Sequence, residues 1–359
     1  MVSTSKIVTR DALQQFIQAF LALSIFIAAQ GAVGAEVRYP DNPFVGSSAV
    51  FISSDGLHSY TRNNLQHQWS ALQAEHTFEP VVHQHVLLVG SSRGLYALRA
   101  QDGRVLWHVE ARNEIFTPVV ANGVAYAGSR DGTLYAFDAI NGRERWRARF
   151  PGWVYSPAFF GDTLITGGQD ATLWAVDSSN GEQRWSRHLP GEVVFSPVPG
   201  GPFTVLATTF AADLIAFDSA SGTQRWRLQT PTANMTTTIS GNRILLTGFD
   251  GSLRKINPDS GTLDWKAQLD GRLSSPRLVD ANLVVISNDE GKAFVLNGED
   301  GARIAEARFE NELVGAPFVN RGRVVQFFRD SGQLSIVAIT RIPAVRSAEV
   351  QPEGGNIHD

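Results

Sequence analysis

The chain has 359 residues, of which 43% are hydrophobic and 18% are charged, and this balance is typical of a soluble globular protein, not of a disordered or membrane-embedded one. The formal net charge is −4, and no stretch gathers the lysine and arginine needed to neutralise nucleic-acid phosphates, so nucleic acid is not expected as a partner. The sequence contains no cysteine, which excludes disulfide bonds, thiol catalysis and a lipid-modified N-terminal cysteine.

Residues 1–35 have the features of a secretory signal peptide. Lys6 and Arg10 give a positive start, an apolar stretch runs from Ala19 to Ala29, and Val33-Gly34-Ala35 is a small-residue cleavage site. The apolar stretch is too short to span about 30 Å of hydrocarbon, which disfavours a permanent transmembrane helix. We therefore predict a mature chain that begins at Glu36, is periplasmic or secreted, and has no direct membrane anchor.

Residues 48–340 are organised by an internal repeat, which we read as eight copies. Six copies carry tryptophan at the same position, and the last four of these tryptophans lie 39 to 41 residues apart. The seventh copy has Ala305 at that position, and the eighth, around Gly332, never reaches a tryptophan. The six repeat tryptophans are Trp69, Trp107, Trp146, Trp185, Trp226 and Trp265.

Each copy contains four short runs with strand character. In one clear copy these start at Thr117, Val124, Thr133 and Arg143, and turn residues such as Asn-Gly and Asp-Gly separate them. One four-stranded sheet cannot cover both of its own faces, so the copies must stack into a ring. The prediction is an all-β, eight-bladed β-propeller of four-stranded antiparallel blades over residues 36–341, with seven blades as the alternative.

The two ends of the repeat region leave one question open. The eighth copy lacks a convincing fourth strand, so we expect either residues 36–46 or the tail after Arg341 to complete a blade and close the ring. Residues 342–359 are predicted to be a flexible C-terminal tail.

A proline recurs at the start of the first strand of each copy. Because proline cannot donate to a strand ladder, this strand is predicted to be an edge strand at the central channel. The prolines are Pro80, Pro118, Pro157, Pro197, Pro276 and Pro317, and Thr237 replaces proline once.

The motif formed by Ala136, Asp138, Gly142 and Trp146 resembles the tryptophan docking motif of quinoprotein-type (PQQ-like) propellers. The resemblance implies that the tryptophan of one blade packs against the next blade. It is closer to the short, non-catalytic BamB-type propellers of outer-membrane protein assembly than to the quinone dehydrogenases, which usually carry adjacent cysteines. BamB-type proteins are normally lipoproteins, and this chain lacks the cysteine that would carry the lipid.

This resemblance implies a non-catalytic scaffold that binds protein partners in the cell envelope and needs no cofactor. No Gly-x-Ser-x-Gly elbow, phosphate-cradling loop or zinc-type histidine pair is present, so we assign no catalytic, cofactor or metal residues. The alternative is a propeller that binds a quinone, a metal or a glycan, possibly an oxidoreductase. We expect a monomer outside any complex.

The candidate partner-binding rim is the set of loops that join the outer strand of one blade to the channel strand of the next, because loops on a rigid scaffold are common recognition surfaces. Trp153 is notable there because it falls outside the repeat position of the other tryptophans. The rim residues are His76, Glu114, Trp153, Glu192, Asn234, Arg272 and Glu312.

Overall fold

The computed structural model describes residues 42–341, apart from residues 194, 202, 240–242, 281, 310–311, 321–322 and 331–332. The chain divides into two compact units, Met1–Tyr39 and Pro40–Asp359, and the described residues belong to the second. The predicted signal peptide and C-terminal tail lie outside the described residues.

The described residues form eight antiparallel sheets, seven with four strands and one with three. Blade 1 consists of β1 (Phe44–Val45), β2 (Ala49–Ser53), β3 (Leu57–Thr61) and β4 (His67–Ala71). Blade 2 consists of β5 (Val81–His83), β6 (Val86–Ser91), β7 (Gly94–Arg99) and β8 (Val105–Glu110). Blade 3 consists of β9 (Val119–Ala121), β10 (Val124–Gly128), β11 (Thr133–Asp138) and β12 (Glu144–Arg149). Blade 4 consists of β13 (Ala158–Phe160), β14 (Thr163–Gly167), β15 (Thr172–Asp177) and β16 (Gln183–His188).

The remaining sheets continue the same order along the chain. Blade 5 consists of β17 (Val198–Gly201), β18 (Thr204–Thr208), β19 (Asp213–Asp218) and β20 (Gln224–Gln229). Blade 6 consists of β21 (Asn234–Ile239), β22 (Ile244–Gly248), β23 (Ser252–Ile256) and β24 (Leu263–Gln268). Blade 7 consists of β25 (Arg277–Asp280), β26 (Leu283–Ser287), β27 (Lys292–Asn297) and β28 (Arg303–Arg308). The last sheet consists of β29 (Glu312–Asn320), β30 (Arg323–Asp330) and β31 (Gln333–Arg341).

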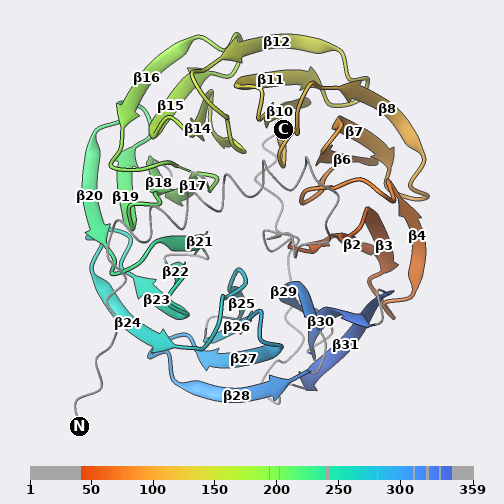
Figure 1. The fold of residues 1–359 in the computed structure, drawn as a ribbon, viewed down its shortest axis with the longest axis vertical. Helices are drawn as coiled ribbons and strands as arrows, with labels where there is room; N and C mark the ends of the chain where they lie inside the picture. The colour runs from red at the N-terminus through yellow and green to blue at the C-terminus, as the bar shows by residue number, and fades with distance from the viewer. Residues whose placement is uncertain are drawn as a thin grey trace, which may run out of the picture. The chain divides into compact units, whose positions relative to one another are not determined.

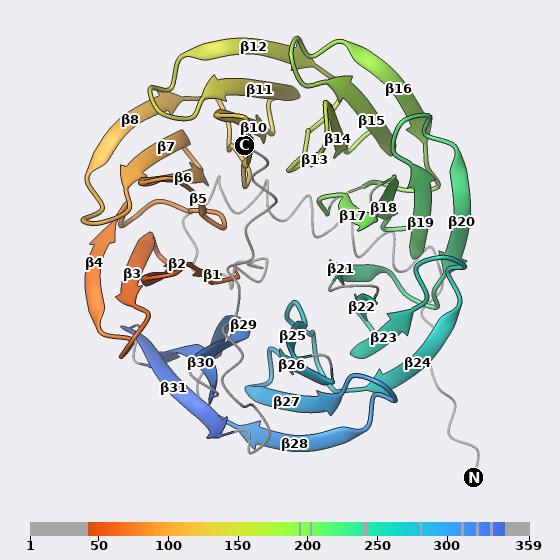
Figure 2. The same cartoon turned by 180° about the vertical axis from the view of Figure 1, so that it is seen from behind.

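The prediction of four-stranded antiparallel blades in a propeller is confirmed, but the main prediction of eight such blades needs correction. Seven sheets are complete blades, which is the number given as the alternative. In the last sheet β31 pairs only with β30 among the described residues, because the eighth repeat copy contains no segment with the pattern of a fourth strand. The first strand of each sheet lies nearest the centre of the ring, and the last strand, which is β31 in the three-stranded sheet, lies at its outer wall (Figures 1 and 2).

Phe44 and Val45, which lie within the predicted segment 36–46, complete blade 1, whereas the sheet of the eighth copy has three strands among the described residues. Phe44 pairs with Phe51 and Val45 with Val50, so β1 is the innermost strand of blade 1. The recurrent prolines also match the described strands. Five of them directly precede a first strand, and Pro317 lies inside β29 at the register shift between Val314 and Phe318.

In the four-stranded blades the two middle strands are mostly buried, whereas the outer strand is more exposed. All five residues of β10 are buried, and β11 is buried except at its last residue, while four of the six residues of β12 are exposed. Middle strands touch a neighbouring sheet on each face, so their sequences read as continuous apolar runs.

The core is divided into layers that lie between neighbouring sheets. Eight clusters of buried side chains connect the eight sheets in a closed cycle. The cycle closes where Val50, Ile52 and Tyr60 of blade 1 pack against Phe318 and Phe327 of the last sheet. This layering holds each blade between two others and fixes the loops at both ends of the ring.

Candidate functional site

Each repeat tryptophan lies against a glycine of the following blade. A Cβ atom added to Gly142 would lie 2.7 Å from the Trp107 ring, and one added to Gly261 would lie 2.4 Å from the Trp226 ring. These glycines have φ near +70°, a left-handed conformation that glycine adopts without strain. The six pairs are Trp69 with Gly103, Trp107 with Gly142, Trp146 with Gly181, Trp185 with Gly222, Trp226 with Gly261 and Trp265 with Gly301.

The indole N–H groups also point into the neighbouring blade. Trp146 Nε1 donates to the Ser178 carbonyl at 2.9 Å and Trp226 Nε1 to the Pro258 carbonyl at 2.8 Å. Trp69, Trp185 and Trp265 make the corresponding bond, whereas the buried Trp107 Nε1 has no partner among the described residues. Because the ring and the N–H group of these indoles are turned toward protein, we propose a packing role for them and not ligand stacking.

The candidate rim residues of blades 2 to 4 form one connected chain of side chains. His76 Nδ1 lies 3.9 Å from Glu114 Oε1, and Arg130 Nε lies 2.8 Å from Glu114 Oε2. The Arg130 guanidinium carbon in turn lies 4.5 Å from the centre of the Trp153 ring. Three of the predicted residues are therefore brought together by Arg130, which the sequence analysis did not single out.

The charges of this group of side chains stabilise one another. Burial alone would raise the pKa of the Glu114 carboxyl, but the nearby His76 imidazole and the charge of Arg130 outweigh it and lower that pKa. Glu114 therefore stays ionised and keeps the Arg130 guanidinium over the Trp153 ring, where the cation and the π face attract each other.

A group of aromatic side chains lies on the same rim, and we call it the aromatic arc. Phe116 and Tyr155 are buried at its centre, and the rest are half-buried around them. Ring centres are 5.3 Å apart for Phe78 and Phe116 and 5.2 Å apart for Phe116 and Tyr155. The arc consists of Phe78, Phe116, Trp153, Tyr155, Phe195 and Phe210.

The arc was missed at the sequence level, although a signal for it exists. Phe78, Phe116, Tyr155 and Phe195 each stand two residues before the recurrent proline, in four consecutive copies. The later copies have Met235, Ser274 and Gly315 at this position. The aromatic position two residues before the proline is thus filled on blades 2 to 5.

The other predicted rim residues differ from one another. Glu192 lies beside the arc in sequence, and burial raises the pKa of its carboxyl. Asn234 is fully buried and accepts a hydrogen bond from Thr230 Oγ1 at 3.0 Å, so its side chain does not contribute to the exposed surface of the rim. Asn234 is the first residue of β21, and its side chain packs inside the protein. Glu312 begins β29, and its side chain lies outside the described part of the structure.

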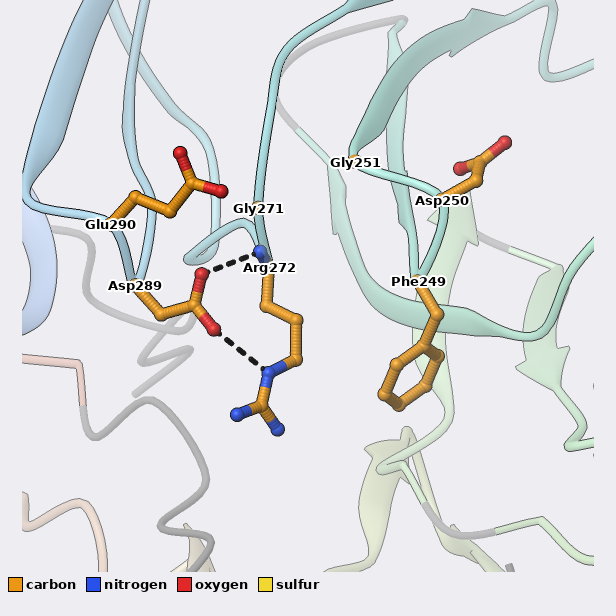
Figure 3. A pocket seen from close by; sticks show the side chains of 7 residues that line it. All are labelled: Phe249, Asp250, Gly251, Gly271, Arg272, Asp289 and Glu290. Atoms are coloured by element: carbon orange, nitrogen blue, oxygen red, sulfur yellow. Dashed lines mark hydrogen bonds and ion pairs between the residues drawn. The ribbon is translucent and has the colours of Figure 1, made fainter. Parts of the chain in front are cut away.

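Arg272 lines an open cavity of about 470 Å³ between blades 6 and 7 on the same rim (Figure 3). Its backbone N donates to Asp289 Oδ1 at 2.8 Å and its Nε to Asp289 Oδ2 at 2.9 Å. The lining residues are Phe249, Asp250, Gly251, Gly271, Arg272, Asp289 and Glu290.

Acidic residues in the turns between second and third strands are held by donors from the third strand. Tyr135 donates its hydroxyl to Asp131 at 2.7 Å, Trp174 its Nε1 to Asp170 at 3.3 Å, and Arg254 its Nη2 to Asp250 at 2.6 Å. Within the described residues no group of three or more acidic or histidine side chains is placed to hold a metal ion. The same residues contain no helix that could cross a membrane.

Stacked four-stranded sheets joined by indole-on-glycine contacts define a β-propeller of PQQ-like repeats. A family model described as outer membrane protein assembly factor BamB matches residues 53–152, 141–249 and 249–342, so the chain belongs to that family.

Two curated relatives match a short part of the chain. An outer membrane protein assembly factor BamB from Burkholderia pseudomallei (strain K96243) is 29% identical over 100 residues, 28% of this chain and 26% of the relative. A beta-alanine-activating enzyme from Danio rerio is 30% identical over 104 residues, 27% of this chain and 9% of the enzyme. The matched stretch is therefore about a quarter or less of either relative.

Two solved structures are similar in fold over most of the chain. BamB from Moraxella catarrhalis has a TM-score of 0.67 at 18% identity, covering 82% of this chain and 92% of that one. The computationally designed Ika8 protein has a TM-score of 0.73 at 13% identity, covering 83% and 95%. At these identities the likeness concerns the fold alone.

Proposed function

We propose that this chain is a non-catalytic scaffold of the cell envelope that binds protein partners during outer-membrane protein assembly. The family description supports the setting, since it names an outer membrane protein assembly factor. The predicted signal peptide supports export, because its charged start, apolar stretch and small-residue end are those of secreted proteins.

The observation that carries the proposal is the aromatic arc with its cationic neighbour. Tryptophan, tyrosine and arginine are the residues most enriched among binding hot spots of protein interfaces. Here Trp153 is half-buried, and Arg130, itself held by Glu114, lies over its ring. A ring fixed in this way loses little side-chain entropy when a partner covers it.

The test is capture of partners by the tagged full chain from an envelope fraction of the source cells, in the unchanged protein and in Trp153→Ala. We expect the substitution to weaken capture at least about tenfold, as truncation of a hot-spot residue does. Phe203→Ala is the matched control, because Phe203 is an aromatic residue that is 68% exposed in the hairpin between β17 and β18 at the opposite end of the blades.

Equal loss of capture in both variants, or no loss in either, would contradict the rim as the binding surface. Quinone absorbance, or bound calcium that purifies with the full chain, would contradict the non-catalytic scaffold itself. N-terminal sequencing of the protein from fractionated cells checks export, with Glu36 as the expected first residue.

A further inference from the structure

The cavity between blades 6 and 7 is built from the same two positions as the contact between Arg130 and Trp153. Phe249 occupies the place of Arg130 in the turn between the second and third strands, and Arg272 occupies the place of Trp153 in the loop that enters the next blade. The ring and the guanidinium have therefore exchanged sides.

The two pairs differ in whether the guanidinium contacts the aromatic ring. Arg130 stacks on Trp153 at 4.5 Å, but Arg272 is turned to Asp289, which accepts bonds from its backbone N and its Nε. The Nη groups of Arg272 have no partner among the described residues. Figure 3 shows the Phe249 ring and the Arg272 guanidinium extending in the same direction with open space between them. Phe249 is 41% exposed, so its ring is accessible from the cavity.

The charges around this slot select among possible occupants. A carboxylate would face Asp289, Glu290 and Asp250, and a cation would face Arg272. A neutral aromatic ring suits both, because its negative face attracts a guanidinium while its positive edge attracts carboxylates. Asp250 pairs with Arg254 and Glu290 with Lys292, so the charges of these two lining carboxylates are already balanced by the chain itself.

We propose that this slot binds an aromatic side chain of a protein partner, inserted between the Phe249 ring and the Arg272 guanidinium. The inference deepens the proposed function, on which it rests, by naming the chemistry that a partner presents to blades 6 and 7. In blades 3 and 4 a cation and a ring at these same two positions stack directly on each other, which shows that this part of the rim supports a contact between a guanidinium and an aromatic ring.

The experiment is a titration of the 15N-labelled full chain with N-acetyl-tyrosinamide, followed by amide chemical shifts. We expect saturable shifts centred on Gly251 and Gly271, which line the slot. N-acetyl-leucinamide should bind about fivefold more weakly, because it lacks the π face that a guanidinium attracts.

Two variants test whether the ligand ring binds between Phe249 and Arg272 or binds non-specifically to the surface. Phe249→Leu keeps an apolar side chain and Arg272→Lys keeps the charge, yet each should weaken tyrosinamide binding about fivefold, because each removes one planar layer. Phe249→Tyr should leave binding unchanged. The proposal would be overturned if the two amides bound with equal affinity, or if Phe249→Leu and Arg272→Lys both left tyrosinamide affinity unchanged. Chemical shift changes centred away from the slot would overturn it as well.

The outcome is distinguishable from that of the partner-capture experiment. Tyrosinamide binding without capture of any envelope protein would support the slot and contradict the assembly role. Capture of a partner by a chain that ignores tyrosinamide would support the assembly role and contradict the slot.

Discussion

At the scale of single residues, the tryptophan and the glycine of successive copies act as one unit. Trp226 is 9% exposed, donates to the Pro258 carbonyl and lies against Gly261. The glycine is required twice, once because its φ is +71° and once because any Cβ would enter the indole ring. The seventh and the first copies, which flank the eighth in the ring, each depart from the pattern: Ala305 replaces a tryptophan in the seventh, and Leu65, with φ of +57°, stands in the first copy four residues before Trp69, where other copies have the glycine.

Trp226→Ala should destabilise the protein by about 3 to 5 kcal/mol, because it removes a large buried side chain and leaves a cavity between blades 5 and 6. Trp226→Phe should recover part of that loss. The measurement is the urea unfolding curve of the full chain, with Trp153→Ala as the control at a half-buried rim position. Similar midpoints for Trp226→Ala and Trp153→Ala would contradict the packing role of Trp226.

At the scale of elements, the last sheet is bound to the ring differently from the others. Neither of its two junctions has an indole-on-glycine contact among the described residues. Its contact with blade 7 is a small cluster around Val285 and Val324, and its contact with blade 1 is the cluster around Phe327. Arg329 adds an ion pair with Asp55 and a bond to Ser54 Oγ at 2.8 Å.

We expect β30 to exchange its amide hydrogens at lower denaturant concentration than β22 does, because local opening follows the weakest packing between units. Hydrogen exchange with mass spectrometry on the full chain, at increasing urea below the unfolding transition, measures this order. The middle strand β22 is the matched reference, since it holds the equivalent place in blade 6 between two junctions with tryptophan. Simultaneous exchange of both strands would show that the ring opens as one cooperative unit.

At the scale of the whole molecule, one ion pair recurs on the outer wall of blades 3, 4 and 5. Asp138 pairs with Arg145 at 2.9 Å, Asp177 with Arg184 at 2.6 Å, and Asp218 with Arg225 at 2.8 Å. A hydrogen bond from Ser179, then one from Arg184, lowers the pKa of Asp177 to about 2. A hydrogen bond from Arg225 is the main cause that lowers the pKa of Asp218 to about 2.

The stability of the protein should therefore fall between about pH 4 and pH 2. A carboxyl whose folded pKa lies below its usual value of 3.8 stabilises the fold above that value and loses the contribution as pH falls through about 2. Each pair contributes little, because these groups are exposed to solvent. Thermal midpoints from pH 5 to pH 2 measure the effect, and in Asp218→Asn the decrease should be smaller. An identical pH profile in that variant would contradict it.

The division between what the sequence and the tertiary structure determined follows the range of the interactions. Turn glycines, alternating strands and a tryptophan every 38 to 41 residues are local patterns that repeat along the chain, so they predicted the strands, the blades and the family. No local pattern determines the number of complete blades, because that number depends on the pairing of β1 with blade 1 and of β31 with β30.

The contacts among the rim side chains could be seen only in the tertiary structure. Sequence analysis placed His76, Glu114 and Trp153 on equivalent loops, but the distance between them depends on how neighbouring blades pack. It could not show that Arg130 joins them, that Asn234 is buried, or that Arg272 turns to Asp289 and leaves a slot beside Phe249. Each of these depends on side chains from two segments that meet only when the ring is assembled, and no pattern within one repeat copy contains that information.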